Sequence, residues 1–325
     1  MKNTPQFSKG TLAGTFETLS QSLWREIPGV YEIDSGKPGP TIGITLHTHG
    51  NEPSGLAIFH YFTQIDALVG RILKGKVIFV LNNIEATRKY LQAIDATEQK
   101  RYRFVDVNIN RLPYDLFSSD NQNYYEVRRV IELIPVWKQF EIALDVHSTT
   151  LPCPPMIIAP PYFDRSLIRG IPAQIILSNI TLVQIGKPAI GFYGKSEIQR
   201  SLFGIETGSH ESPESFVCGI ASVEALLVNA GVLEKSQETD PVPQMSYSDY
   251  FVASSVVFPD TSYSLTRIFG NFERVEKGVI LATGTGLNIV MPFDGHTLFC
   301  KEHLKPLSLS EEVMFIAKPA VEFVL

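Results

Sequence analysis

The chain has 325 residues, of which 44% are hydrophobic and 19% charged, so it can bury a substantial core in one large domain or in a large domain with a smaller one. A formal net charge of −6 and the absence of any Lys/Arg run exclude the basic surface that a nucleic-acid partner requires. Three widely spaced cysteines without a CxxC pair argue against a disulfide framework and against a thiolate zinc site.

The N-terminal segment, MKNTPQFSKGTLAGTFETL, lacks the apolar core of a signal peptide. Apolar runs elsewhere, such as 77–81, are much shorter than a membrane span. We therefore expect a cytoplasmic protein with no membrane partner. The sequence leaves a homo-oligomer open.

Short apolar runs typical of buried strands alternate with helical patterns over the first two-thirds of the chain. The predicted strands are 42–46, 77–81, 142–146 and 156–159. The predicted helices are 53–65, 124–140 and 213–232. This alternation predicts an α/β fold in which a sheet has helices on both faces.

The pattern changes near residue 233. Residues 233–246 are polar, contain proline and lack periodicity, so we interpret them as a linker between a large domain over 1–232 and a second domain over 247–325. The second domain contains only short strand-like runs separated by turns, which predicts a small all-β domain. Its predicted strands are 250–258, 278–282, 287–291, 297–300 and 313–317.

The segment Thr45-Leu-His-Thr-His-Gly-Asn-Glu-Pro-Ser54 joins a predicted strand to a predicted helix through a tight turn. Sites in open α/β sheets form at the carboxyl ends of strands, where this turn lies. His49 and Glu52 are three residues apart, and the turn can bring an imidazole and a carboxylate together at zinc-binding distance. Catalytic zinc usually takes three protein ligands, so a third ligand at another strand end is expected.

His147 supplies that third ligand, because it follows the buried strand 142–146 at its carboxyl end. Asp145 lies two residues earlier on the same side of the strand and is placed to support the imidazole with a hydrogen bond. His49, Glu52 and His147 therefore predict one zinc ion per chain. An isolated HxxE is more often a solvated turn, and the prediction depends on the two clusters together.

A zinc hydrolase also needs a base for the attacking water. Glu206, in Gly204-Ile-Glu-Thr-Gly208, is a carboxylate within an apolar strand, and burial would raise its pKa toward the range of a proton shuttle. The alternative is a strand-end carboxylate paired with a lysine or arginine.

Arginines and amides are dense in Arg101-Tyr-Arg103-Phe-Val-Asp106-Val-Asn108-Ile-Asn110-Arg111. Guanidinium groups interleaved with amides are suited to bidentate recognition of a carboxylate. The alternation of Asp106, Asn108 and Asn110 predicts one polar face of an extended segment; a solvated charged loop is the alternative.

Four motifs occur in the order found in the succinylglutamate desuccinylase and aspartoacylase family, which the chain resembles over roughly residues 40–232. They are Thr48-His-Gly-Asn-Glu52, Asn108-Ile-Asn-Arg111, Asp145-Val-His147-Ser-Thr-Thr150 and Gly204-Ile-Glu206-Thr-Gly208. The family is similar to zinc carboxypeptidases in its catalytic core and has a small β domain after it. The resemblance therefore implies a mixed sheet flanked by helices.

The resemblance also implies roles for individual residues. His49, Glu52 and His147 would bind zinc, and Glu206 would be the general base that later hands its proton to the leaving amine. Arg103 would polarise the scissile carbonyl and stabilise the oxyanion. The substrate carboxylate would be held by Asn110, Arg111 and, with a less well matched spacing, Arg200.

Three positions depart from the family pattern. Asn108 stands where an aspartate is usual, and His47 stands where a glycine is common, which adds a candidate fourth imidazole near the metal. Phe315 occupies the stretch in which aspartoacylases carry a tyrosine. These departures concern the pocket rather than the metal or the base.

The sequence thus predicts a zinc-dependent hydrolase that cleaves the amide bond of an N-acyl amino acid or a related small amide, with a small carboxylate-bearing molecule as its substrate. One alternative is a metallocarboxypeptidase-like peptidase, because a peptide also ends in a carboxylate. The other is a catalytically silent metal-dependent binding protein, which would have no need of Glu206. The β domain would shape the entrance to the site or mediate association.

Overall fold

The computed structural model describes residues 7–115, 117–160, 163–186, 188–192, 201–210, 212–234, 247–301 and 311–320. Its α-helices are α1 (Lys9–Gln21), α2 (Ser54–His60), α3 (Ile84–Gln92), α4 (Ala96–Arg101), α5 (Tyr125–Trp137), α6 (Ile180–Val183) and α7 (Pro213–Asn229). The strands of the first two-thirds are β1 (Leu23–Trp24), β2 (Ile27–Pro28), β3 (Val30–Asp34), β4 (Thr41–Leu46), β5 (Lys76–Leu81), β6 (Ile142–Thr149), β7 (Met156–Ala159), β8 (Ile175–Ser178) and β9 (Leu202–Ser209). The C-terminal strands are β10 (Ser248–Val257), β11 (Ser264–Leu265), β12 (Glu273–Val275), β13 (Ile280–Thr283), β14 (Ile289–Val290), β15 (Gly295–Leu298) and β16 (Glu312–Pro319).

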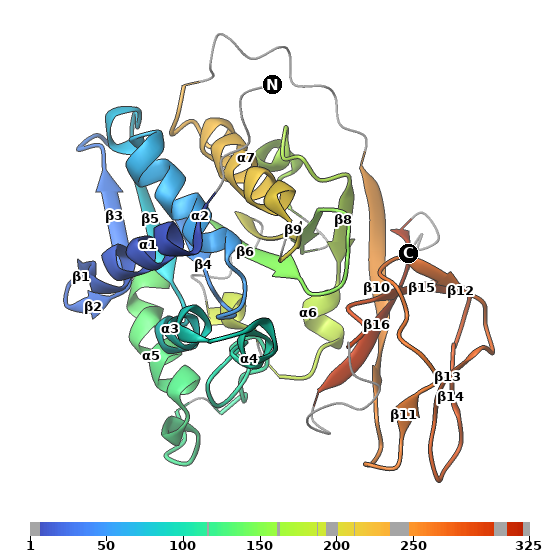
Figure 1. Cartoon of the computed structure of the whole chain (residues 1–325). Coiled ribbons are helices and arrows are strands. Elements are labelled where there is room, and N and C mark those ends of the chain that lie inside the picture. The colour runs from blue at the N-terminus through green and yellow to red at the C-terminus, as the bar shows by residue number, and fades with distance from the viewer. Residues whose placement is uncertain are drawn as a thin grey trace.

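An eleven-stranded mixed sheet forms the centre of the molecule, in the order β12-β15-β16-β10-β8-β7-β9-β6-β4-β5-β3 (Figure 1). The neighbours β5, β4, β6 and β9 are parallel, so their carboxyl ends meet at one edge. The pair of β7 with β9 is antiparallel and makes the sheet mixed. The predicted α/β fold with a mixed sheet and C-terminal β strands is confirmed.

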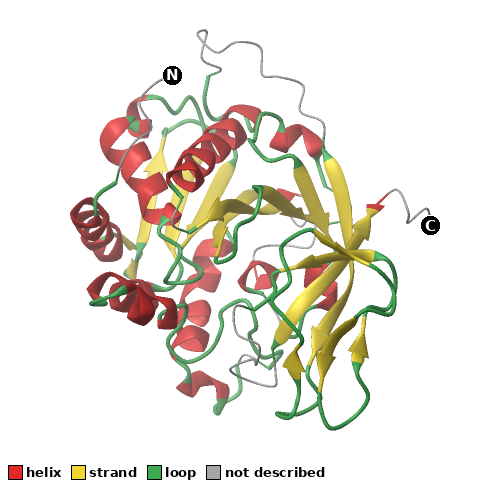
Figure 2. Cartoon of the chain, turned by 45° about the vertical axis from the view of Figure 1, so that its right-hand side comes forward, coloured by secondary structure: helices red, strands yellow, loops and turns green. Residues whose placement is uncertain are grey.

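Helices cover both faces of the sheet (Figure 2). One face, represented by Ile44, Phe79 and Leu144, packs in a single hydrophobic cluster with residues of α1, α2 and α7. The other face, represented by Ile78 and Ala143, packs with residues of α5. Because side chains alternate along a strand, a strand covered on both faces is mainly apolar, as the predicted buried runs are.

The four predicted strands correspond to β4, β5, β6 and β7, and the three predicted helices to α2, α5 and α7. The helix predicted over 53–65 changes character after His60, where a π-helical turn spans Tyr61–Ile65. Helix α5 continues through Pro135 to Trp137. Within the described residues, no helix has both the length and the apolar character needed to cross a membrane.

The C-terminal strands extend the central sheet. Strand β10 pairs in parallel with β8, where Ser248–Phe251 lie opposite Ile175–Ser178, and it pairs on its other side with β16. A separate small sheet contains β11, β13 and β14. Most of the predicted linker, residues 235–246, lies outside the described residues, so the division at residue 232 stays a prediction.

Candidate active site

The loop after β4 carries the first two predicted ligands. His49 Nδ1 lies 2.7 Å from Glu52 Oε1, and both side chains are buried. Gly50 allows the loop to pass close to its neighbours, because a Cβ atom there would lie 2.4 Å from the Ala86 carbonyl carbon. The Gly50 amide donates to the Arg103 carbonyl at 2.9 Å, which fixes the loop against the arginine-rich segment.

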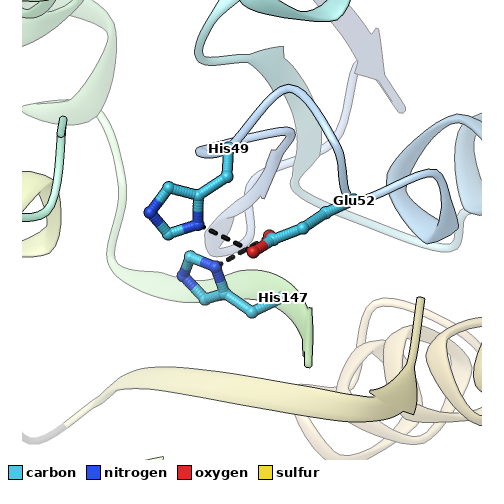
Figure 3. A group of neighbouring side chains, drawn as sticks. All are labelled: His49, Glu52 and His147. Carbon is cyan, nitrogen blue, oxygen red and sulfur yellow. Dashed lines mark hydrogen bonds and ion pairs between the residues drawn. The ribbon is translucent and has the colours of Figure 1, made fainter. Parts of the chain in front are cut away.

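The third predicted ligand comes from β6, the strand next to β4 in the sheet. His147 Nδ1 lies 3.0 Å from Glu52 Oε2, so the carboxylate stands between the two imidazoles (Figure 3). The candidate ligand atoms of His49, Glu52 and His147 all lie within 4.8 Å of one another. The structure therefore brings together three residues, of which the first and the last are 98 positions apart in the sequence (147 − 49).

The outward-facing nitrogen of each imidazole is held by a different kind of group. His147 Nε2 lies 2.9 Å from Asp145 Oδ2, whereas His49 Nε2 lies 3.1 Å from Asn108 Oδ1. Metal-binding histidines commonly donate the second ring N–H to such an acceptor, which fixes the ring orientation and directs the other nitrogen to the metal. Here both Nδ1 atoms are directed inward.

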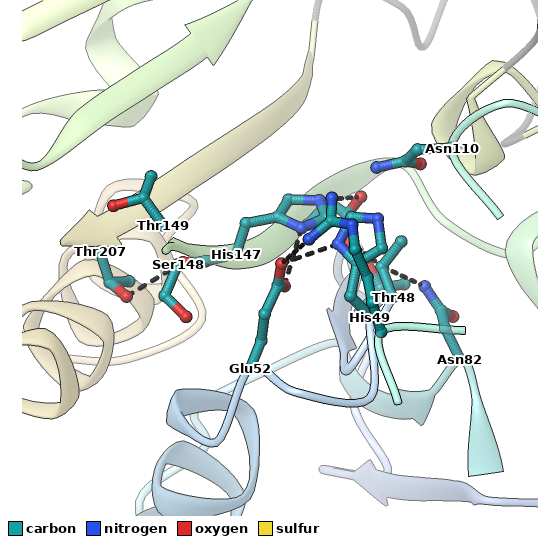
Figure 4. Close-up of polar contacts among 12 residues, drawn as sticks. Thr48, His49, Glu52, Asn82, Asn110, His147, Ser148, Thr149 and Thr207 are labelled. Atoms are coloured by element: carbon teal, nitrogen blue, oxygen red, sulfur yellow. Dashed lines mark hydrogen bonds and ion pairs between the residues drawn. The ribbon is translucent and has the colours of Figure 1, made fainter. Parts of the chain in front are cut away.

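Asp145 is itself fixed from the adjacent strand ends. Its Oδ1 accepts hydrogen bonds from the hydroxyls of Thr45, at 2.7 Å, and Thr48, at 2.8 Å. Asn82, at the end of β5, donates through Nδ2 to Thr48 Oγ1 at 2.8 Å (Figure 4). The carboxyl ends of β4, β5 and β6 therefore support the orientation of His147.

The electrostatics of the cluster are asymmetric. Burial, together with the nearby Arg103 guanidinium, lowers the pKa of His49 to about 4, so this imidazole is neutral, as a metal ligand must be. Burial opposes the charge on His147, but the carboxylates of Asp145 and Glu52 raise its pKa well above the usual value. The two imidazoles outweigh the effect of burial on Glu52 and lower its pKa well below the usual value. The buried anion therefore favours a cation at this position.

Glu206 lies beside the cluster on β9. Its backbone pairs with His147 of β6 on one side and with Met156 of β7 on the other. The carboxyl group is buried, and its Oε2 has no hydrogen-bond partner among the described residues. Burial first, and then the nearby carboxylates of Glu52 and Asp145, raise its pKa to about 8 despite the opposing charges of His147 and Arg103.

A cavity of about 980 Å³ gives access to the cluster and is lined by His49, Glu52, Arg103, His147 and Glu206. The side chain of Arg103 is 36% exposed, and its Nη1 lies 3.4 Å from Glu52 Oε1. The guanidinium therefore faces both the cavity and the candidate metal site.

Asn110 and Arg111 also line this cavity, and both have protein partners. Arg111 donates through Nε to Glu312 Oε2 at 2.7 Å and through Nη1 to the Asn110 carbonyl at 2.8 Å. Asn110 Oδ1 accepts from the Ala189 amide at 3.2 Å. Arg200 lies outside the described residues.

The expectation of one extended polar face through Asp106 is wrong. The segment around Asp106 consists of turns and bends rather than an extended strand, and the Asp106 carboxylate accepts from the Tyr125 amide at 2.7 Å, at the start of α5. His47 is not part of the candidate metal cluster. Its Nε2 accepts from the Leu56 amide at 3.3 Å, so it caps α2 instead.

Residues of the C-terminal region form one wall of the cavity. This agrees with one of the two roles that the sequence suggested for that region. The wall residues include Asn271, Phe299, Lys301, Glu311 and Phe315. Phe315 lies under the Arg111 guanidinium, with 5.8 Å between its ring centroid and Arg111 Cζ. Lys301 Nζ lies 3.1 Å from Glu311 Oε2.

The sequence model of the succinylglutamate desuccinylase/aspartoacylase catalytic domain matches residues 38–191 of this chain. No curated protein matches the sequence. Among solved structures, succinylglutamate desuccinylase from Vibrio cholerae is 13% identical, with a TM-score of 0.69 over 90% of this chain and 86% of that chain. The desuccinylase from Chromobacterium violaceum is 16% identical, with a TM-score of 0.64 over 97% and 99% of the two chains.

A succinylglutamate desuccinylase/aspartoacylase from Rhodobacter sphaeroides is 18% identical, with a TM-score of 0.59 over 89% of this chain and 88% of that chain. At these identities the three structures establish the shared fold. The family match over residues 38–191 includes the loop of His49 and Glu52, the arginine-rich segment and His147. The chain is therefore similar to the succinylglutamate desuccinylase/aspartoacylase family in sequence over residues 38–191 and shares the fold of its solved members.

Proposed function

We propose that this chain is a zinc-dependent hydrolase that cleaves the amide bond of an N-acyl amino acid or a related small amide. The observation that carries the proposal is the position of Glu206. A buried carboxyl oxygen without a partner among the described residues lies beside the His49–Glu52–His147 cluster in the same cavity.

The residues of the cluster are suited to zinc. Two imidazoles and one carboxylate are a common protein ligand set for catalytic zinc, which keeps a further position open. His49 and His147 have their outward nitrogens held by Asn108 and Asp145, which leaves both Nδ1 atoms to the ion. When bound, zinc would supply Lewis acidity that lowers the pKa of a water and polarises the scissile carbonyl.

Glu206 is proposed as the general base. It would accept a proton from the attacking water and later deliver it to the nitrogen of the leaving amine, so that one carboxylate serves both steps. A cation beside it would lower its pKa from the value of about 8 in the metal-free site and favour the ionised form at neutral pH.

The cations of the cavity are proposed to bind and polarise the substrate. The Arg103 guanidinium faces the cluster and would stabilise negative charge that develops on the carbonyl oxygen. Glu312 and the Asn110 carbonyl fix Nε and Nη1 of Arg111, and a substrate carboxylate would be bound by its remaining N–H groups together with Asn110. Arg200 stays a predicted second contact for that carboxylate.

The peptidase alternative differs only in the group attached to the scissile amide, because both substrates present a carboxylate. A panel of N-acyl amino acids assayed beside a panel of short peptides separates the two. We expect turnover of at least one N-acyl amino acid at a kcat/KM well above that of any peptide.

Glu206→Gln tests the catalytic role against a silent binding protein. The amide keeps the shape of the carboxylate but cannot accept the proton, so zinc should stay bound while hydrolysis of the best substrate falls by about 100-fold or more. A Glu206→Gln variant that keeps wild-type activity would overturn the assigned base, and a wild-type protein that is inactive on both panels would overturn the proposed reaction.

A further inference from the structure

A second buried acid near the site has no role in the proposed chemistry. Glu126, the second residue of α5, is fully buried and is not among the candidate metal ligands. A carboxylate removed from water is costly unless charges or hydrogen-bond donors compensate it. Its partners therefore indicate why the chain places an acid there.

Four N–H groups surround the Glu126 carboxylate. Oε1 accepts from the Val105 amide at 2.6 Å and from Asn83 Nδ2 at 3.0 Å. Oε2 accepts from the Asp106 amide at 3.0 Å and from the Val107 amide at 3.1 Å. Both oxygens thus act only as acceptors, and three consecutive backbone amides of one loop are bound to one side chain.

The contact between this loop and α5 is reciprocal. While Glu126 binds the amides of the loop, Asp106 Oδ2 accepts from the Tyr125 amide at 2.7 Å, at the first residue of the helix. The amides at the start of a helix lack partners within the helix, so Asp106 acts as a cap supplied from a distant part of the chain. Asn83 extends the contact to α3, because its Oδ1 accepts from the Ala86 amide at 3.1 Å.

Residues 105–107, which Glu126 binds, lie in the sequence between Arg103 and the proposed carboxylate-binding residues Asn110 and Arg111. Arg103 lies two residues before Val105, and Asn108 follows Val107 directly. Asn108 Oδ1 contacts His49 Nε2 and also accepts from the Asn110 amide at 2.9 Å. A displacement of 105–107 would therefore move the arginine on one side and the carboxylate-binding asparagine on the other.

We propose that Glu126 is a positioning residue that clamps the loop 105–107 through its three backbone amides and so sets where Arg103, Asn110 and Arg111 meet the substrate. This inference rests on the proposed hydrolase function for its kinetic consequences. The clamp itself is a property of the loop and is measurable without substrate.

Glu126→Gln is the appropriate variant because it preserves size while changing one acceptor into a donor. Each carboxylate oxygen faces two N–H groups, so the new NH₂ group would lose two hydrogen bonds and point its hydrogens at donors. Glu132→Gln is the matched control: it removes an acid from the same helix, but Glu132 is 41% exposed and pairs with Arg129 at 2.6 Å.

The experiment measures hydrogen exchange by mass spectrometry across the zinc-loaded protein, together with kcat and KM for the best N-acyl amino acid and for its α-amide, which lacks the carboxylate. In Glu126→Gln we expect exchange at 105–107 to be at least about 10-fold faster while the sheet is unchanged. We also expect the preference for the acid over the amide to fall by about 10-fold through a higher KM, with zinc content retained. Glu132→Gln should match the wild type.

Unchanged exchange and unchanged acid preference in a folded Glu126→Gln protein would overturn the clamp, as would faster exchange spread evenly over the chain. If Glu126→Gln does not fold, the same measurements on Asp106→Ala test the clamp. This variant removes the exposed carboxylate that accepts from the Tyr125 amide and leaves Glu126 in place. Faster local exchange with a raised KM is then expected, and wild-type values would overturn the inference. A wild-type protein without hydrolase activity contradicts the proposed function, while the exchange measurement still decides the clamp.

Discussion

The two histidines of the cluster differ in the charge of the group behind them. His147 Nε2 contacts the carboxylate of Asp145, whereas His49 Nε2 contacts the neutral amide of Asn108. A carboxylate favours the imidazolium and an amide does not, in line with the opposite pKa shifts of the two rings. At position 108, where the resemblance leads us to expect an aspartate, the asparagine contacts His49 without adding a negative charge to the site.

The raised pKa of Glu206 makes the stability of the metal-free protein depend on pH. Between the ordinary value of 4.5 and the folded value of about 8, the folded protein keeps a proton that the unfolded chain has released. The free energy of unfolding should therefore fall as pH rises from 5 to 8, by on the order of 3 kcal/mol from this group.

Glu206→Gln removes that contribution because its amide does not titrate. Urea unfolding at pH 5 and pH 8, with a chelator present, should show a steeper loss of stability in the wild type than in the variant. Parallel pH profiles of the two proteins would mean that Glu206 titrates normally in the folded state.

The residues of the candidate metal cluster are the most predictable from sequence, because each lies in a short polar motif at the end of an apolar strand. Their supporting contacts are not predictable in this way. The contact of His49 with Asn108 spans 59 residues, and the contact of Glu126 with the Asp106 amide depends on where α5 packs. The prediction for Asp106 failed for a related reason. Its alternation with Asn108 predicts a shared face only in an extended segment, and this loop consists of turns and bends.

At the scale of elements, the β4–α2 connection explains the buried His47. This residue has a positive φ of 51°, and its ring accepts from the Leu56 amide in the first turn of α2. Burial lowers its pKa to about 4, so the ring is neutral and Nε2 is available as an acceptor. His47 thus stabilises α2, the helix that follows the loop of His49 and Glu52.

His47→Ala should destabilise the protein by about 1–3 kcal/mol, because it leaves the Leu56 amide without its acceptor and opens space beside α2. Zinc content should stay at the wild-type level if the ring is no ligand. His47→Gln places an oxygen close to the position of Nε2 and should recover part of the stability in urea unfolding. Loss of zinc from both variants would instead support the fourth-imidazole hypothesis.

Helices α3 and α4, which bury few residues, were not predicted from the sequence. Helices α3 and α4 begin at the capping side chains Asn83 and Asp95, yet α3 buries only three residues and α4 none, so the spacing of apolar residues is too weak to indicate them. Strands β4 to β7 are predictable because both of their faces are covered and each contains a run of mainly apolar residues.

At the scale of the whole molecule, the C-terminal strands complete both the sheet and the cavity. Met156 and Leu177 of the first part pack in one cluster with Val252 and Phe315 of the second. This packing explains how a region with a distinct sequence pattern contributes a wall to the site. The cytoplasmic location and a homo-oligomer stay predictions.

A chain ending at residue 232 should therefore be markedly less stable than the full chain. It would expose the edge of β8, together with the apolar residues that β10 and β16 cover, and exposed edges promote aggregation. Thermal unfolding and size-exclusion chromatography should show a lower Tm and aggregated material. A monomeric truncated protein with an unchanged Tm would indicate that residues 1–232 fold independently of the rest.

We propose above that His49, Glu52 and His147 hold a zinc ion on which hydrolysis depends. The most direct measurement is a zinc titration of chelator-treated protein, in which bound metal and N-acyl amino acid hydrolysis are recorded together for the wild type and His49→Ala. We expect about one zinc per wild-type chain, with activity rising in proportion to bound zinc, and neither binding nor activity in the variant. Full activity of a protein that contains no divalent metal would contradict it.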